Sequence, residues 1–270
     1  MAIQTSAVIL LGGQKGPPAE APPSPPTPCI SPDDGSLCEP ASPFSLDDDL
    51  HAGRRRGPSS PMARGLHVLT TEAAALASLA RLYEADADAR HGFESAVRIV
   101  ARPPQGKLVV VGVGKSGHIG RKLVATLQSL AIRSVFLHPT EAMHGDLGII
   151  DSARDALLFI SFSGRTQELL QLLPHLDPSL PTIVMTSQPA CDLIRRRPTA
   201  VLLPAPIPEP EDKSFGVPAP TTSTTVALAL CDALALTAAD ELHRHLPAEF
   251  ARNHPGGAIG AVRPRTVDGP

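Results

Sequence analysis

The stretch of sequence that decides the fold is 107-KLVVVGVGKSGHIGRK-122. It begins with a short apolar run rich in valine, turns through Gly112 and Gly114, and continues from Gly117 with apolar residues at helical spacing. The pattern predicts a strand that ends in a glycine-rich turn and opens a helix. Such a turn brings free backbone N–H groups and the positive end of the helix to one point, and this geometry receives phosphate or another anion.

Three classes of phosphate-bearing ligand use turns of this kind. A Walker loop needs a glycine five residues before its Gly-Lys pair, and Val109 stands there instead. The glycines fit the dinucleotide fingerprint G-x-G-x-x-G, but the acid expected at the end of the next strand, 133–137, is replaced by His138. Both classes are therefore disfavoured, and a sugar phosphate is the third class.

Apolar runs alternate with helical patterns along most of the chain. The predicted strands are 108–113, 133–137, 156–161, 182–186 and 199–203, and the predicted helices are 117–130, 166–174, 189–196 and 222–243. One or two amphipathic helices are expected between Thr70 and Pro103, and the Pro-rich stretch 204–220 is expected to be an ordered loop. Strands that are apolar on both faces and separated by helices form parallel sheets covered on both sides. We therefore expect an α/β fold: a three-layer αβα sandwich with a five-stranded, flavodoxin-like parallel sheet, flanked by N- and C-terminal helices.

The composition divides the chain into parts. Residues 1–62 hold 12 of the 30 prolines and carry charge runs at 47–49 and 54–56 without apolar periodicity. Such a segment cannot bury enough surface to offset its chain entropy. We expect a disordered Pro-rich arm at 1–62, a folded sugar-phosphate domain at 63–261 and a tail at 262–270.

Charge and cysteine content narrow the partners and the compartment. The net charge is −3, with one tyrosine and no tryptophan, which disfavours a nucleic-acid partner. No apolar run is long enough to suggest a signal sequence or to approach the roughly 20 residues of a membrane span. The four cysteines, Cys29, Cys38, Cys191 and Cys231, form no C-x-x-C pair, so neither a zinc cluster nor a disulfide framework is indicated. We expect a cytoplasmic protein.

A second turn resembles the first. The segment 161-SFSGRT-166 follows a predicted strand and opens a predicted helix. The hydroxyls of Ser161, Ser163 and Thr166 can converge with the first helical amides on one phosphate, or they can simply cap the helix. Two such turns at the carboxyl ends of neighbouring strands favour a binding site, because open α/β sheets bind ligands at that edge.

Five motifs together resemble a known family. They occur in the order 112–122, 138-HPTEAMHGDLG-148, 161-SFSG-164, 219-APTTSTT-225 and 254-HPGG-257. Residues 70–261 thereby resemble the sugar isomerase (SIS) domain of the arabinose-5-phosphate isomerase family. The resemblance implies interconversion of D-arabinose 5-phosphate and D-ribulose 5-phosphate without metal or organic cofactor, usually by a tetramer. The active-site positions that it implies are Lys115, His144, Glu168, Glu211 and His254.

The chemistry of such a reaction assigns roles to these residues. Moving a carbonyl between C1 and C2 needs a base for the α-proton, an acid for the oxygens and positive charge beside the enediolate. Glu168, one turn after the serine-rich turn, is the predicted base, and Lys115 supplies charge beside Gly114 and Ser116. The histidines at 144 and 254 can move protons near neutral pH. Each residue also has a purely structural alternative. Glu168 can stabilise the start of its helix, and Lys115 can be a surface cation. His144 can hydrogen-bond a loop, and the residues at His254 can form a simple chain reversal.

The chain departs from the family at Arg165, where members usually carry an acid, and at Phe162, which replaces a small polar residue. The family's loop glutamate maps to Glu211 only with a gap, and Asp212 is the ungapped choice. The sequence ends soon after His254, so the paired cystathionine-β-synthase-type modules of many members are not expected. A non-catalytic sugar-phosphate sensor is the alternative, although it would not need Glu168 and both histidines. Because the helix 222–243 is apolar nearly all round, we expect a homo-oligomer, a dimer or a tetramer.

Overall fold

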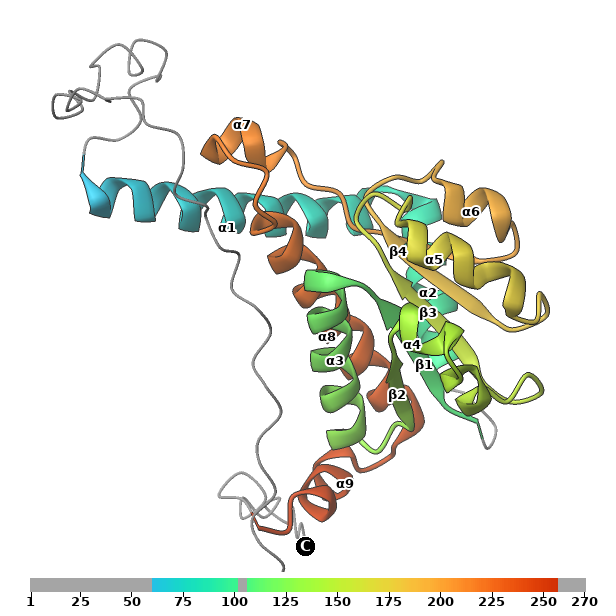
Figure 1. Ribbon diagram of the computed structural model, residues 1–270. Helices are drawn as coiled ribbons and strands as arrows, with labels where there is room; N and C mark the ends of the chain where they lie inside the picture. The colour runs from blue at the N-terminus through green and yellow to red at the C-terminus, as the bar shows by residue number, and fades with distance from the viewer. Residues whose placement is uncertain (1–59, 102–105, 257–270) are drawn as a thin grey trace, which may run out of the picture. The chain divides into compact units, whose positions relative to one another are not determined.

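The protein has a five-stranded parallel sheet at its centre (Figure 1). The computed structural model describes residues 60–101 and 106–256. The strands are β1 (Leu108–Gly112), β2 (Ser134–Leu137), β3 (Ala156–Ile160), β4 (Thr182–Thr186) and β5 (Val201–Pro204), in the order β2-β1-β3-β4-β5. Val109 of β1 stands opposite Val135 of β2 and Leu157 of β3, which fixes the register. The predicted flavodoxin-like order is confirmed.

Helices cover both faces of the sheet because strand side chains alternate in direction. Val110, Leu158 and Ile183 enter one core, with α1 (Pro61–Ala85), α2 (Ala87–Ala101), α3 (Gly114–Ser129) and α8 (Thr222–Leu242). Val109 and Phe159 enter the other core, beneath α4 (Pro139–Met143), α5 (Gln167–Leu172) and α6 (Asp192–Arg196). The three predicted layers are therefore present.

Several short elements have no counterpart among the predicted ones. They are α4, α7 (Glu211–Phe215), α9 (Leu246–Asn253) and the 3₁₀ turns Asp146–Ile149 and Leu173–His175. Elements of three to eight residues contain too little of the apolar period to be recognised. The helix α1 begins at Pro61, capped by the Ser60 hydroxyl, so helical structure starts ahead of the predicted Thr70 and of the predicted domain boundary. Most of the predicted arm and the tail lie outside the described residues.

The helix α8 contradicts the prediction that no segment approaches the length of a membrane span. With 21 residues it is long and apolar enough to cross a membrane by length and composition, although no such segment was expected from the sequence. Ten of its residues are buried, Leu230 and Leu234 among them, and it packs against α1, α2 and α3. An apolar helix of this kind is typical of a domain core.

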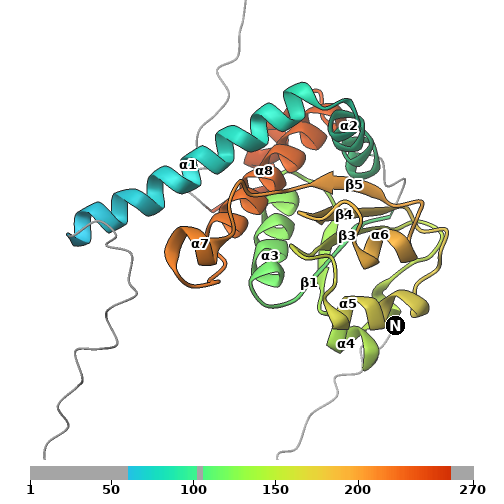
Figure 2. The same cartoon turned by 90° about the horizontal axis from the view of Figure 1, so that it is seen from above.

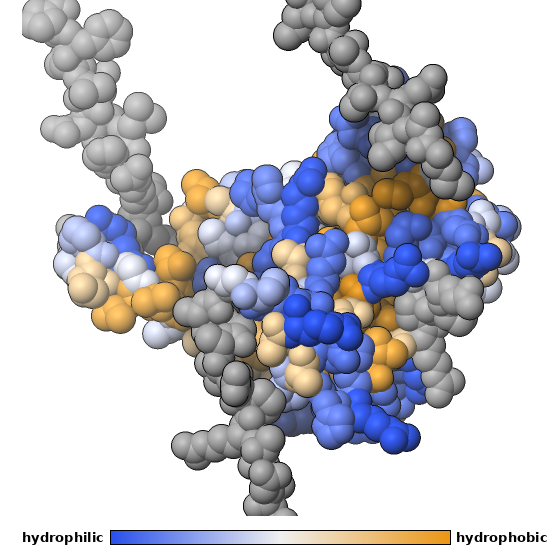
Figure 3. All heavy atoms as spheres, turned by 90° about the horizontal axis from the view of Figure 1, so that it is seen from below, coloured by the Kyte–Doolittle hydropathy of each residue, from blue (hydrophilic) through white to orange (hydrophobic). Residues whose placement is uncertain are grey.

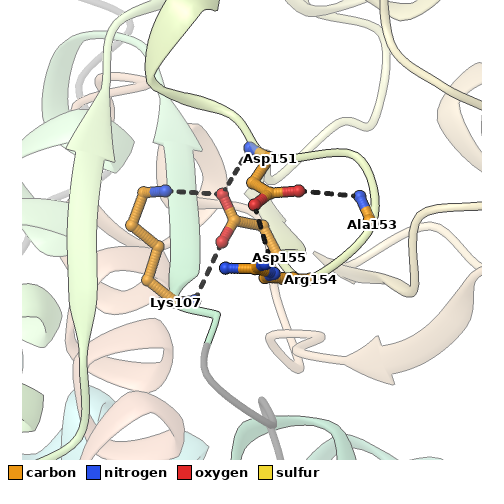
Figure 4. Close-up of polar contacts among 5 residues, drawn as sticks. All are labelled: Lys107, Asp151, Ala153, Arg154 and Asp155. Atoms are coloured by element: carbon orange, nitrogen blue, oxygen red, sulfur yellow. Dashed lines mark hydrogen bonds and ion pairs between the residues drawn. The ribbon is translucent and has the colours of Figure 1, made fainter.

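An ion pair between the half-buried Lys107 and the buried Asp155 joins the amino ends of β1 and β3 (Figure 4). The Lys107 Nζ lies 2.6 Å from the Asp155 carboxylate, which also accepts hydrogen bonds from the backbone N–H groups of Lys107 and Asp151. Burial alone would raise the pKa of Asp155, but these hydrogen bonds and the lysine charge outweigh it and lower that pKa. Gly106 permits the close approach, since a Cβ atom there would lie 1.9 Å from the Arg154 carbonyl oxygen.

The first half of α1 extends away from the sheet and passes beside α7 (Figure 2). The buried residues of α1, Ala75 and Leu79, lie in its second half. The first half leaves Met62, Leu66 and Leu69 exposed. Figure 3 shows apolar surface at this projecting end of the molecule.

Candidate active site

A cavity of about 470 Å³ lies at the carboxyl edge of the sheet. Its walls come from the ends of β3 and β4, the start of α3, the start of α8 and the segment around α7. Ile119, Ile160 and Met185 form part of its apolar lining, and Lys115, Ser116, Glu211 and Asp212 supply polar and charged groups. Parallel sheets bind ligands at this edge, because loops from neighbouring strands converge there.

The glycine-rich turn brings the first helical turn of α3 to the cavity. Gly114 has a φ of +56°, a conformation that favours glycine, and Val113 precedes the helix without a side-chain cap. Lys115 and Ser116 line the cavity. Lys115 is exposed and makes no ion pair within the part of the chain that the structure describes. The uncapped amides and the lysine together form an environment suited to an anion.

Glu211 is fixed by the start of α8. Its Oε1 accepts hydrogen bonds from the Thr221 N–H at 2.7 Å, the Ser223 N–H at 3.0 Å and the Ser223 hydroxyl at 2.7 Å. The Thr221 side chain does not cap this helix, because its hydroxyl donates to the Ala219 carbonyl. Glu211 is buried at the cavity wall, whereas Asp212 is exposed. Of the two candidate acids, Glu211 is the one held in place.

The helix α7 that carries Glu211 contacts the projecting half of α1. The His67 Nε2 lies 2.9 Å from the Ser214 carbonyl oxygen, and the His67 ring packs edge-on against Phe215 with the ring centroids 5.8 Å apart. No sequence signal identified His67, because a contact between positions this distant in the chain leaves no local pattern.

The serine-rich turn satisfies its hydroxyls internally. The hydroxyls of Ser161 and Thr166 are 2.8 Å apart, the Gly164 N–H donates to the Ser161 hydroxyl, and the Arg165 N–H donates to the Ser163 hydroxyl. The turn contributes to the cavity lining through Phe162, whereas the three predicted hydroxyl residues lie outside the lining. The alternative that the sequence left open, a cap on the following helix, is not seen either, because no side chain caps the start of α5.

Three of the predicted catalytic residues stand apart from the cavity lining. Glu168 on α5 and His144 at the end of α4 are exposed, and both helices cover the face of the sheet opposite α3. His254 follows α9, where its Nδ1 lies 2.8 Å from the Phe250 carbonyl oxygen and its ring stacks on Phe250. The chain thus brings Lys115, Ser116 and Glu211 to one cavity and leaves the other three outside it.

The far position of His254 follows from the length of α3. Asn253 donates to the carbonyls of Gln128 and Ser129 at the carboxyl end of α3. Lys115 lies at the amino end of the same helix, which has 16 residues and is therefore about 24 Å long. Within one chain, His254 cannot contact a ligand held beside Lys115.

The charges at the cavity suit a small phosphorylated molecule. Two long helices, α3 and α8, begin there, and Glu211 occupies amides of α8 while α3 keeps its first turn open. Between Ser60 and Ala101 and between Gly106 and Gly256, no three His, Cys, Asp or Glu side chains are grouped so that they could hold a metal ion. The arrangement can bind an anion, pack a short carbon chain and present one oriented carboxylate.

Comparison with known proteins agrees with this description. Residues 104–237 match the SIS domain. The chain is 45% identical over 158 residues to arabinose 5-phosphate isomerase GutQ of Salmonella typhi, an alignment covering 58% of this chain and 47% of that protein. It is 36% identical over 156 residues to arabinose 5-phosphate isomerase KpsF of Escherichia coli. The chain spans about half the length of the curated relatives that it matches.

Two solved structures are similar over nearly their whole length. One is an Escherichia coli protein in complex with arabinose 5-phosphate, which is 32% identical, with a TM-score of 0.60 and coverage of 72% of this chain and 97% of that one. The other, a phosphosugar isomerase homologue from Bacteroides fragilis, is 33% identical, with a TM-score of 0.59 and coverage of 73% of this chain and 99% of that one.

Proposed function

This chain belongs to the family of proteins built on the SIS domain, and we propose that it is an aldose–ketose isomerase of a phosphorylated sugar. The proposed substrate pair is D-arabinose 5-phosphate and D-ribulose 5-phosphate. The observation that carries the proposal is the cavity in which Lys115, the open start of α3 and the fixed carboxylate of Glu211 meet. The activity of the curated relatives and the sugar-phosphate complex of the Escherichia coli protein support the substrate class.

In this proposal the phosphate binds at the start of α3. The amides after Gly114, the Ser116 hydroxyl and the Lys115 ammonium hold it, because helix amino ends and cations stabilise an anion. The carbon chain then extends along the apolar wall towards Glu211. The site suits a molecule with an anionic group at one end and a short carbon chain that reaches Glu211, and a sugar phosphate meets that description.

The proton transfer is assigned to Glu211. Its carboxylate removes the proton from C2 of the aldose, and the electron pair forms the enediolate. The resulting carboxylic acid, whose proton exchanges with solvent, protonates C1 while the hydroxyl proton moves from O2 to O1. We assign no proton transfer to Glu168, the predicted base, because its side chain is exposed and lies outside the cavity lining.

We further propose that the protein works as a homo-oligomer, a dimer or a tetramer. The exposed apolar residues Met62, Leu66 and Leu69 on α1 and Leu236 on α8 support an interface. Within its own chain, His254 lies at the opposite end of α3 from Lys115. If a histidine acts at the site, a second copy of the chain would supply it. Light scattering at micromolar concentration tests this, and a monomeric mass would contradict it.

The decisive experiment is a proton NMR assay of the purified protein with a panel of pentose and hexose phosphates. We expect D-arabinose 5-phosphate to be converted to D-ribulose 5-phosphate, with exchange of the C2 proton in deuterated solvent. Binding of the sugar phosphate without conversion or exchange would instead identify a sensor. Conversion of another sugar phosphate would keep the reaction class and change the substrate.

A further inference from the structure

A short segment that continues from β5, residues 204–207, separates two cavities. Ala205 and Ile207 line the candidate active site, whereas Pro204 and Pro206 line a second cavity of about 700 Å³. Such alternation is typical of an extended chain, whose consecutive side chains point to opposite sides. The segment is therefore a wall of the candidate active site, with Ala205 and Ile207 on its inner side.

The first peptide group of this wall is fixed from both sides. The Ala205 N–H donates to the Thr186 carbonyl at the end of β4, at 2.8 Å. The Pro204 carbonyl accepts a hydrogen bond from the Tyr83 hydroxyl at 2.9 Å. The C=O and N–H groups of one trans peptide point in opposite directions, and β5 is the last strand of the sheet. Tyr83 thus holds the wall from the free edge of the sheet, where no further strand can do so.

Tyr83 is itself held in place. It lies near the end of α1, and its half-buried ring packs edge-on against Phe93 of α2, with the ring centroids 5.8 Å apart. Burial raises the pKa of Tyr83, so its hydroxyl keeps the proton that it donates. None of the described residues of α1 lines the cavity, so the hydroxyl can act on a ligand there only through the wall.

We propose that Tyr83 is a positioning residue, whose hydroxyl holds the wall 204–207 in the place where this wall contacts the carbon chain of a sugar phosphate. Inorganic phosphate has no carbon chain and gains nothing from the wall. The inference rests on the proposed function for the class of ligand alone and does not depend on turnover. The alternative is a purely structural role, in which the hydroxyl only satisfies a carbonyl of an edge strand.

The expected effect follows from the loss of one hydrogen bond. Tyr83→Phe removes the hydroxyl and keeps the ring. A wall that is no longer held leaves its binding position in part of the molecules, and the apparent affinity falls with the fraction that stays competent. One hydrogen bond corresponds to about a fivefold change. We expect the dissociation constant of D-arabinose 5-phosphate to rise about fivefold and that of inorganic phosphate to stay unchanged.

The test combines isothermal titration calorimetry with hydrogen–deuterium exchange of the free proteins. The proteins are the wild type, Tyr83→Phe and the control Leu76→Ala, which removes apolar contact of the same helix with the core and leaves the Tyr83 hydroxyl. In Tyr83→Phe we expect faster exchange of the Ala205 amide and the selective loss of sugar-phosphate affinity. In Leu76→Ala we expect a lower unfolding temperature with the affinity of the wild type for both ligands.

The outcomes separate this inference from the proposed function. Unaltered exchange at Ala205, unaltered affinity for the sugar phosphate, or an equal loss for both ligands overturns the role of Tyr83, as does an equal selective loss in Leu76→Ala. Selective loss in a protein that binds sugar phosphates without converting them upholds the role of Tyr83 and removes the isomerase proposal. A wild type that binds the sugar phosphate no better than inorganic phosphate overturns the role of Tyr83, and turnover by that protein would leave the isomerase proposal standing.

Discussion

The strand β1 is flanked by two lysines whose surroundings differ sharply. Lys107 precedes β1, is half-buried and forms an ion pair with the buried Asp155, whose carboxylate also accepts two backbone hydrogen bonds (Figure 4). Lys115 follows β1, is exposed at the cavity and has no such partner among residues 60–101 and 106–256. At the carboxyl edge the buried carboxylate, Glu211, is bound to the start of α8 instead. A lysine that lies at an open cavity without an ion pair can attract a ligand, whereas a paired lysine stabilises the fold.

The largest effect on turnover is expected from substituting Glu211, the acid at the cavity wall. Glu211→Gln keeps the shape and an oxygen for the start of α8 but removes the basicity. Because general acid–base catalysis contributes about 10²–10⁴-fold, kcat should fall at least about 100-fold. The matched variant Glu168→Gln, outside the cavity lining, should stay within a few-fold. Steady-state assays and C2-proton exchange in deuterated solvent measure both.

The same pair of variants can reverse the assignment. If Glu168→Gln abolishes turnover and exchange while Glu211→Gln does not, the base is on α5 and the role of Glu211 is only to cap α8. The reaction class would survive that result, but the position of the reacting carbons would move towards the serine-rich turn.

The second prediction concerns the amino edge of the sheet. Lys107→Met leaves the buried Asp155 carboxylate without its half-buried cation, and losing this charged hydrogen bond should lower the free energy of unfolding by about 2 kcal/mol. Affinity for sugar phosphates should not change. Urea unfolding and calorimetry measure the two quantities, and unaltered stability would mean that the pair does not hold the strands together.

Lys115, at the other end of β1, should affect ligand binding and leave the stability of the fold unchanged. Lys115→Met is expected to weaken sugar-phosphate binding about 10–100-fold, because hydrogen bonds to charged groups contribute about 1.5–3 kcal/mol. The free energy of unfolding should stay within about 0.5 kcal/mol of the wild type, as expected for an exposed position. A marked loss of stability here would remove the distinction between the two lysines.

The pH dependence of stability sharpens the comparison further. The pKa of Asp155 in the folded protein lies below its ordinary value of 3.8, so its contribution is fully present above that pH and is lost as the pH falls through the lower folded value. The stability difference between the wild type and Asp155→Asn should therefore shrink during acidification in this range. A difference that stays constant to lower pH would show that the charge of Asp155 is not the cause.

The fold followed from the sequence more fully than the site did. The valine-rich run of β1 and the glycines after it identify a strand, a turn and a helix, since burial on both faces and a positive φ restrict the residue types strongly. The order of the sheet then follows from right-handed crossovers. Lys115 and Ser116 line the cavity because they belong to that same turn.

The remaining site residues depend on contacts that local patterns do not carry. A serine-rich turn after a strand indicates the correct edge of the sheet, yet it does not indicate whether its hydroxyls face a ligand or each other, as Ser161 and Thr166 do. Likewise, Glu211 reaches the start of α8 across a loop, and α5 places Glu168 on the face of the sheet opposite α3. Side-chain direction is set by packing between distant segments, and only the folded chain reveals it.

The smallest effect is expected from His67, which touches the site only through α7. Its ring nitrogen lies at the Ser214 carbonyl and its ring packs on Phe215, so His67→Ala removes a support of the helix that carries Glu211. One hydrogen bond of about 1 kcal/mol corresponds to roughly a fivefold loss in kcat/KM. The variant His67→Gln, whose amide can still donate to that carbonyl, should recover most of the loss, and Arg64→Ala on the same exposed stretch of α1 should show none. A His67→Ala enzyme with unaltered kcat/KM would mean that the binding of Glu211 to the start of α8 positions this acid without help from α1.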